Sequence, residues 1–331
     1  MSNERQHNGY FVLAILFLVA LYVTDLVIRP KAMTYPGPLF ISKFADTSLW
    51  YSWNIPSIVA AILLLTGTAL ALTRIANRYS SGFTFFIPIA YLAITLCNPG
   101  SAMLTPFHFA ALLLVPSLHF YFHYGVAEQN VSHLFVSGFL LDMAVCFCPP
   151  VIWLAPVLML TGLGFSEEKA KYLVACLLSI TLPLIMAASV VYLTLGLDEA
   201  VSVFPDLLAR ATDAGIGHIH LTMAAVCRIV AISVIAIYGT LTVFRNLGGY
   251  KIAKYQVYTR LAIIMLALVA ISIVFAGDTD RPWSILTAMP AVLLTNELFN
   301  ADNRVGSKHT GTLILIAVLV IAVERTIYFI R

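Results

Sequence analysis

Long apolar runs follow one another along the chain, separated by short segments that hold most of the polar residues. Runs of about 16–20 apolar residues approach the length at which a helix crosses a bilayer. The pattern therefore predicts an all-α integral membrane protein, a bundle of about eleven transmembrane helices. The expected spans are 10–28, 55–74, 83–98, 106–124, 132–147, 150–165, 172–195, 219–245, 261–276, 284–299 and 309–330.

Two breaks and two loops add detail to this pattern. The prolines of Cys148-Pro149-Pro150 divide 132–165, which would be too long for one crossing, so a tight hairpin is expected there. Asn98-Pro99-Gly100-Ser101 ends the third span, either as a turn or as irregular backbone that is buried or lines a cavity. Aromatic residues in the first outer loop, 29–54, predict interfacial helices, and 199–213 is a weaker candidate of the same kind.

Composition supports a single membrane domain, 1–331. Of the 331 residues, 60% are hydrophobic and only 11% are charged, which is too few for the surface of a soluble domain of this size. The net charge of +3 is small and its basic residues are scattered, so no nucleic-acid partner is expected. The first apolar stretch lacks a small-residue cleavage site and is expected to be a retained helix.

The distribution of basic residues orients the predicted helices. With the N-terminus inside, eleven lysines and arginines fall in inner segments and six in outer ones. Arg74, Arg78 and Arg260 belong to the inner set, and Arg260 is expected just before the span 261–276. Both acidic loops, 198–213 and 278–280, then lie outside.

Asp142 and Arg228 are charged residues inside predicted spans, at a similar expected depth. A charge at mid-membrane costs about 2.5–3.5 kcal/mol on insertion scales and usually faces protein or water. One interpretation is an Asp142–Arg228 ion pair that only holds helices together. The other is a polar cavity open to the outside, in which Arg228 binds an anionic head group.

Further polar residues are expected on the same outer side. Arg325 would bind phosphate together with Arg228, and His108 lies near the same surface. Asp46 and Asp25 are the outward-facing carboxylates that could serve as a general base.

A histidine group is expected at the opposite side. His119 and His123 share a helical face, with Glu128 and His133 across a short turn, as in some metal sites. However, the glutamate of H-E-x-x-H is missing, and aromatic interface belts commonly hold such residues. No nucleotide-binding or haem-attachment motif occurs either, so we expect no metal and no cofactor.

The order of features resembles an uncharacterised polytopic inner-membrane family of the Bacteroidetes. The resemblance lies in NPGSAMLTPFHFAALLLVPSLHFYF, HLFVSGFLLDMAVCFCPPVIWLAPVLML and ILTAMPAVLLTNELF, and would cover most of the chain. It implies a multi-pass protein of a bacterial inner membrane with no assigned activity.

The architecture also looks like that of multipass glycosyltransferases that use polyprenyl-linked sugars. The long first outer loop with Asp46 is similar in outline, although only Asp25 stands where those enzymes carry a clearer acidic motif. The resemblance implies an envelope-lipid enzyme with a polyprenyl-phosphate-linked substrate among its membrane-lipid partners. The alternatives are a non-enzymatic scaffold with unknown protein partners, or a transporter in which the buried charges form a relay.

Overall fold

The computed structural model describes most of the middle of the chain and leaves both ends undescribed. The described residues are 54–79, 86–96, 98–126, 130–164, 166, 168–212, 252–275 and 282–296, with isolated positions between 226 and 244. These ranges contain helices and no strand. In chain order the elements are α3 (Ile55–Tyr79), α4 (Phe86–Leu96), η1 (Pro99–Ala102), α5 (Pro106–Val126), α6 (Val131–Phe147), η2 (Pro149–Trp153), α7 (Leu154–Leu163), α8 (Lys169–Leu195), α9 (Leu197–Thr212), α11 (Ile252–Val274) and α12 (Ser284–Asn296).

Three of the described helices are long and apolar enough to cross a membrane, judged by length and composition: Ile55–Tyr79, Lys169–Leu195 and Lys254–Val274. Helices also occupy the other predicted spans wherever the chain is fully described, but several are shorter. The protein is therefore helical and compatible with a membrane location. The spans predicted at 10–28 and 309–330 lie outside the described residues, and 219–245 is described only in part.

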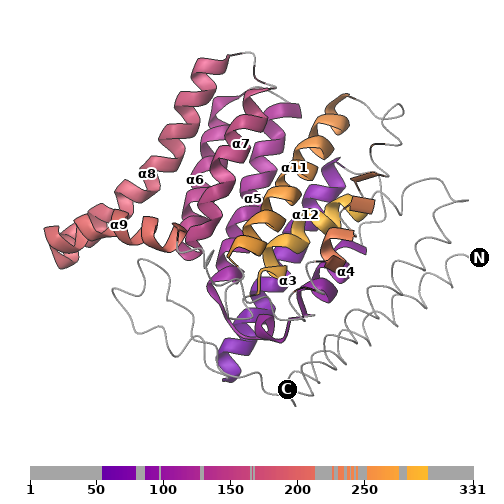
Figure 1. Cartoon of the computed structure of the whole chain (residues 1–331), viewed down its shortest axis with the longest axis horizontal. Coiled ribbons are helices and arrows are strands. Elements are labelled where there is room, and N and C mark those ends of the chain that lie inside the picture. The colour runs from indigo at the N-terminus through magenta and orange to yellow at the C-terminus, as the bar shows by residue number, and fades with distance from the viewer. Residues whose placement is uncertain are drawn as a thin grey trace, which may run out of the picture.

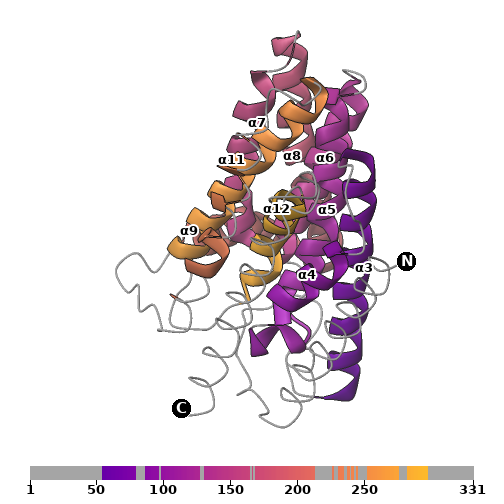
Figure 2. The same ribbon diagram turned by 90° about the vertical axis from the view of Figure 1, so that its right-hand side faces the viewer.

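The helices form a bundle in which α12 lies among α3, α4, α5 and α11 (Figures 1 and 2). It contacts all four, and every one of its 13 residues is buried. At 1.5 Å per residue, α12 is about 20 Å long, well short of a hydrocarbon core of about 30 Å. The helix is therefore enclosed by protein on all sides.

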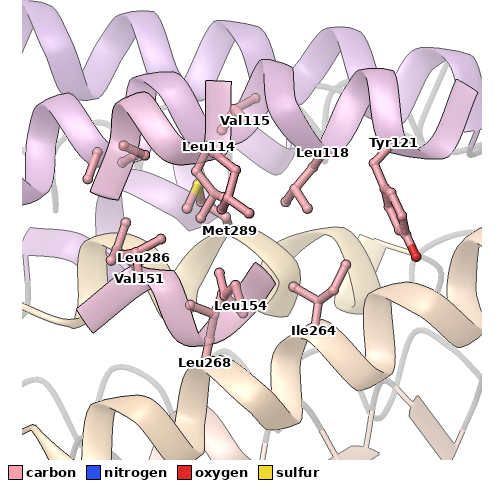
Figure 3. Close-up of a cluster of buried hydrophobic side chains, with 14 of the residues drawn as sticks. Leu114, Val115, Leu118, Tyr121, Val151, Leu154, Ile264, Leu268, Leu286 and Met289 are labelled. Atoms are coloured by element: carbon pink, nitrogen blue, oxygen red, sulfur yellow. The ribbon is translucent and has the colours of Figure 1, made fainter. Parts of the chain in front are cut away.

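Branched aliphatic side chains fill the space around α12. Leucine and valine residues of α5 meet Leu286 and Met289 of α12, and Leu268 of α11 approaches from the opposite side (Figure 3). These side chains are almost completely buried. In a lipid environment such close packing supplies much of the attraction between helices, because lipid tails are as apolar as the core.

α5 and α6 pack against each other along their whole length in antiparallel directions. Phe109 stacks on Phe147 at one end, with ring centroids 5.0 Å apart. Near the middle, the hydroxyl of Ser117 donates to the backbone carbonyl oxygen of Ser137 at 2.8 Å. The hydroxyl of Ser137 donates to the backbone carbonyl oxygen of Ser117, also at 2.8 Å. Small residues let the two backbones approach, and the reciprocal hydrogen bonds fix their register.

The predicted hairpin at Cys148-Pro149-Pro150 is confirmed. The amide of Cys148 donates to the carbonyl of Ala144 and ends α6, and the two prolines begin η2. α7 then runs back toward the other end of the bundle, where Thr161 meets Tyr121 of α5. Prolines without an amide hydrogen explain why one continuous helix cannot form here.

α8 and α9 project from one side of the bundle (Figure 1). Large apolar side chains cover the outer face of α8, including Leu177, Ile185 and Leu193. α9 lies across the end of α8 with one face buried, and the carbonyl of Ala211 accepts a hydrogen bond of 2.9 Å from the indole of Trp153. The helix expected at 199–213 is thus present, and its location in the membrane interface stays a prediction.

The position expected for Arg260 was wrong. Instead of preceding a helix at 261, it lies inside α11, which already begins at Ile252, and its side chain is 0% exposed. The physical reason is that the apolar stretch of α11 extends past the arginine, back to Lys254. Arg260, expected from the sequence among the basic residues of the inner segments, is therefore buried inside the bundle.

Candidate functional site

The carboxylate of Asp142 is the central feature of the candidate site. α6 is apolar around it, and the side chain is only 1% exposed. Among the described residues, neither carboxylate oxygen has a hydrogen-bond partner. A carboxylate in such surroundings is costly to keep ionised unless a cation or a donor reaches it.

The structure of α8 explains why Asp142 can lie at this contact. Gly138 lets α8 approach so closely that a Cβ atom there would overlap the hydroxyl of Ser179. One turn further along, Pro183 interrupts the hydrogen bonding of α8. The backbone amide of Leu184, at this interruption, lies near enough to the Asp142 carboxylate to interact with it electrostatically, but it is not placed well enough to form a hydrogen bond. Gly138 thus permits the close contact of α6 with α8, and the irregularity of α8 at Pro183 follows one turn later, beside the buried Asp142.

An apolar groove opens between α6 and α8, between their first turns and the close contact at Gly138 and Ser179. It has a volume of about 660 Å³ and is lined by residues such as Phe135, Val136 and Val174. Lys171 also lines the groove and forms an ion pair of 2.6 Å with Glu168. The groove is therefore apolar, with the side chain of Lys171 at its edge.

His108 has a different environment. The amide and hydroxyl of Thr105 approach its Nδ1 at 3.1 and 2.8 Å, and its Nε2 lies 3.0 Å from the carbonyl oxygen of Ser101. Because the Thr105 amide can only donate, Nδ1 accepts and the proton resides on Nε2. Both ring nitrogens are used inside the protein, so a phosphate would have to replace one of these contacts.

The segment before α5 is the irregular backbone predicted at Asn98-Pro99-Gly100-Ser101, and it is buried in protein. The side chain of Asn98 accepts from the amide of Gly100, and the hydroxyl of Ser101 approaches the carbonyl oxygen of Thr95 at 2.5 Å. The hydroxyl of Ser57, on α3, accepts from the amide of Leu104. These bonds provide the irregular backbone with partners that a helix would otherwise supply.

A second buried charge was missed by the sequence reasoning. The guanidinium of Arg260 lies 5.1 Å from the ring centre of Tyr121 and donates to the Tyr121 carbonyl oxygen at 3.3 Å. The hydroxyls of Tyr121 and Tyr172 both donate to the carbonyl oxygen of Leu158. The arginine and the two tyrosines therefore join α5, α7, α8 and α11. The signal that could have revealed this is the long apolar window around Arg260.

The three histidines expected near the other end of α5 do come together. The rings of His123 and His133 have centroids 4.4 Å apart, and His119 is 6.4 Å from His123. Nε2 of His123 lies 2.7 Å from a guanidinium nitrogen of Arg78. No group of three or more metal-ligating side chains with suitable geometry occurs in the described part of the chain. Glu128 lies outside it.

A family model described as a family of unknown function, DUF6427, matches residues 37–329. The chain belongs to this family. Neither the curated proteins nor the solved structures contain a match to it. The description of the family names no activity, so a function for this member of DUF6427 has to be inferred from its own residues.

Most of the predicted catalytic and phosphate-binding residues of this DUF6427 member lie outside the described ranges. They are Asp25, Asp46, Arg228 and Arg325. The Asp142–Arg228 ion pair therefore stays a prediction, as do the roles of the two acids. Only Asp142 and His108 can be placed, and they lie in different environments: the histidine has protein partners at both nitrogens, whereas the acid has none among the described residues.

Proposed function

We propose that this member of DUF6427 is a multi-pass protein of a bacterial inner membrane that acts on an anionic envelope lipid. The apolar groove between the first turns of α6 and α8 supports the lipid part of the proposal, because its lining suits a hydrocarbon chain. It lies at the opposite end of these helices from the outer side, where the polar residues of the proposed site are expected. The outer face of α8 is also covered by large apolar side chains, as expected of a helix in contact with lipid. A lipid could then enter the groove laterally from the bilayer.

The proposed substrate class is a polyprenyl-phosphate-linked glycan, and the proposed reaction is glycosyl transfer. Arg228 and Arg325 would bind the phosphate, since arginine forms planar, bidentate contacts with phosphate oxygens. His108 would contribute only if a phosphate displaces one of its present contacts. Asp46 or Asp25 would act as the general base at the outer surface.

The test compares the envelope lipids and glycans of a deletion strain with those of strains carrying variants. Asp46→Asn and Asp25→Asn each remove a proposed base, and loss of a lipid-linked glycan product in at least one of them is expected. Asp198→Asn is the matched control, because Asp198 is an exposed carboxylate at the start of α9. Unchanged glycans in both variants would remove the catalytic roles. An unchanged profile in the deletion strain would overturn the proposal.

Asp142 favours a second candidate function, an ion-coupled transporter. Buried carboxylates in membrane helices commonly belong to proton or ion pathways, and Asp142 lies beside the interruption of α8 at Pro183. In proteoliposomes, Asp142→Asn would then abolish proton-driven uptake while the protein stays folded. Ion-independent transport, or no transport by the wild-type protein, would argue against this candidate.

A further inference from the structure

The end of the bundle that holds the histidines contains a group of nitrogen-bearing side chains that the proposed function does not use. We define the histidine cluster as Arg78, His119, His123 and His133. Arg78 is in the last turn of α3, His119 and His123 are near the end of α5, and His133 is in the first turn of α6. Three helices therefore bring these groups together, although Arg78 is far from the three histidines in the sequence.

The contact between Arg78 and His123 determines which atoms carry protons. A guanidinium can only donate hydrogen bonds, so Nε2 of His123 accepts at 2.7 Å and the ring proton resides on Nδ1. Arg78 is exposed and uses one nitrogen for this contact, which leaves other donors of its planar fork directed elsewhere. The histidine is thus oriented by the arginine.

The remaining contacts of the cluster are mostly between rings. His133 lies 4.4 Å from His123 and stacks on Phe120, and His119 is tilted against Tyr79 at 6.2 Å. Nδ1 of His119 is buried and has no hydrogen-bond partner among the described residues. Packed imidazoles of this kind repel one another when protonated, so an anion would stabilise them together.

The charge balance within the described residues also favours an anion. No carboxylate in these ranges forms an ion pair with Arg78, and Glu168 is paired with Lys171. Glu128 and Glu167, which adjoin α5, α6 and α8 in the sequence, lie outside the described residues. A binding test therefore has to separate an external anion from these two side chains.

We propose that the histidine cluster binds a phosphate-type anion. Phosphate offers several acceptor oxygens, which can meet the guanidinium fork of the exposed Arg78 and an N–H of the half-buried His133 at once. The positive-inside rule assigns this end of the bundle, where the first turn of α6 also borders the apolar groove, to the inner surface. The histidine cluster is therefore separate from Arg228 and Arg325, the phosphate-binding residues proposed for the outer side. The phosphate would be the head group of an inner-leaflet phospholipid or a soluble phosphate.

The test uses the full-length protein in nanodiscs of zwitterionic phosphatidylcholine. One arm titrates inorganic phosphate and follows binding by calorimetry, and the other adds phosphatidylglycerol and counts bound lipids by native mass spectrometry. Arg78→Gln is expected to weaken binding at least about tenfold, the effect of about 1.4 kcal/mol. Arg74→Gln is the matched control, since it removes the same charge from an exposed site one turn earlier in α3. It should stay within about twofold of the wild type.

A second variant protects the test against misfolding. His133→Gln removes one imidazole without touching Arg78, and it should weaken the same ligand while the protein elutes as the wild type does. Binding in the first arm alone would identify soluble phosphate, and binding in the second alone would identify the lipid head group. Equal affinities of Arg78→Gln and Arg74→Gln would overturn the proposal. The absence of binding by the wild-type protein in both arms would also overturn it. Binding that appears only after Glu128→Gln or Glu167→Gln counts as such an absence, because a carboxylate of the chain would then occupy the cluster.

Discussion

His108 and Asp142 are both only 1% exposed, and both lie in helices of the same bundle. Around His108, the backbone of the preceding segment folds so that each ring nitrogen meets a group of Thr105 or Ser101. Around Asp142, by contrast, the described residues provide apolar side chains and an interrupted helix, and neither oxygen has a hydrogen-bond partner among them.

The difference shows how the two buried groups relate to the fold. A buried polar group with local partners costs little stability, because the segment that buries the group also supplies its hydrogen-bond partners. A buried carboxylate without such partners depends on something further away, either a distant part of the chain or a ligand. The partners of His108 therefore come from its own segment, whereas Asp142 depends on a group outside the described residues or on a ligand.

The largest expected effect comes from removing Asp142. If Arg228 is its partner, Asp142→Ala leaves a buried arginine uncompensated and lowers the free energy of unfolding by about 3–5 kcal/mol. The double variant Asp142→Ala/Arg228→Ala should recover most of this loss. Unfolding of the purified protein in mixed micelles measures all three. Additive losses in the double variant would mean that the two residues do not pair.

Removing the ring of His108 should have a smaller effect. His108→Phe keeps the bulk but leaves the Thr105 amide and the Ser101 carbonyl without their partner, which costs about 1–3 kcal/mol. The same unfolding assay applies. His119→Phe, on the same helix, is the control, because Nδ1 of His119 has no partner among the described residues and little should change. A loss as large in the control would contradict the comparison.

The smallest expected effect concerns the reciprocal serines of α5 and α6. Ser137→Ala removes a hydrogen bond to the carbonyl of Ser117, and such interhelical bonds contribute about 0.6 kcal/mol on average in membranes. Ser189→Ala is the control, since that exposed hydroxyl bonds only within α8. A decrease of more than about 2 kcal/mol in the free energy of unfolding would mean that Ser137 matters as much as His108 does.

The existence of the described helices, and some of their ends, could be predicted from the sequence because apolar runs and prolines act locally. The hairpin at Cys148-Pro149-Pro150 follows from two missing amide hydrogens, and it is present. The position of Arg260 could not be predicted in this way. A hydropathy reading places an arginine at the end of a span. In the bundle, however, the guanidinium of Arg260 lies over the ring of Tyr121 and donates a hydrogen bond to the Tyr121 carbonyl oxygen.

The candidate site was predictable only in part. The sequence marks Asp142 as costly because of its apolar neighbours, and its burial agrees with that. It also places His119 and His123 on one face of a helix, but not beside Arg78, which depends on how α3 packs against α5. Contacts between distant helices carry no local signal, so the spatial grouping had to come from the structure.

The enclosed position of α12 has a consequence for how the protein is made. Synthesis proceeds from the N-terminus, so α3, α4 and α5 emerge from the ribosome long before α12, which they contact. α6, α8 and α9 pack on one another and on α5 without α12. The native packing of α3, α4 and α5 is therefore complete only after residues 284–296 have been synthesised.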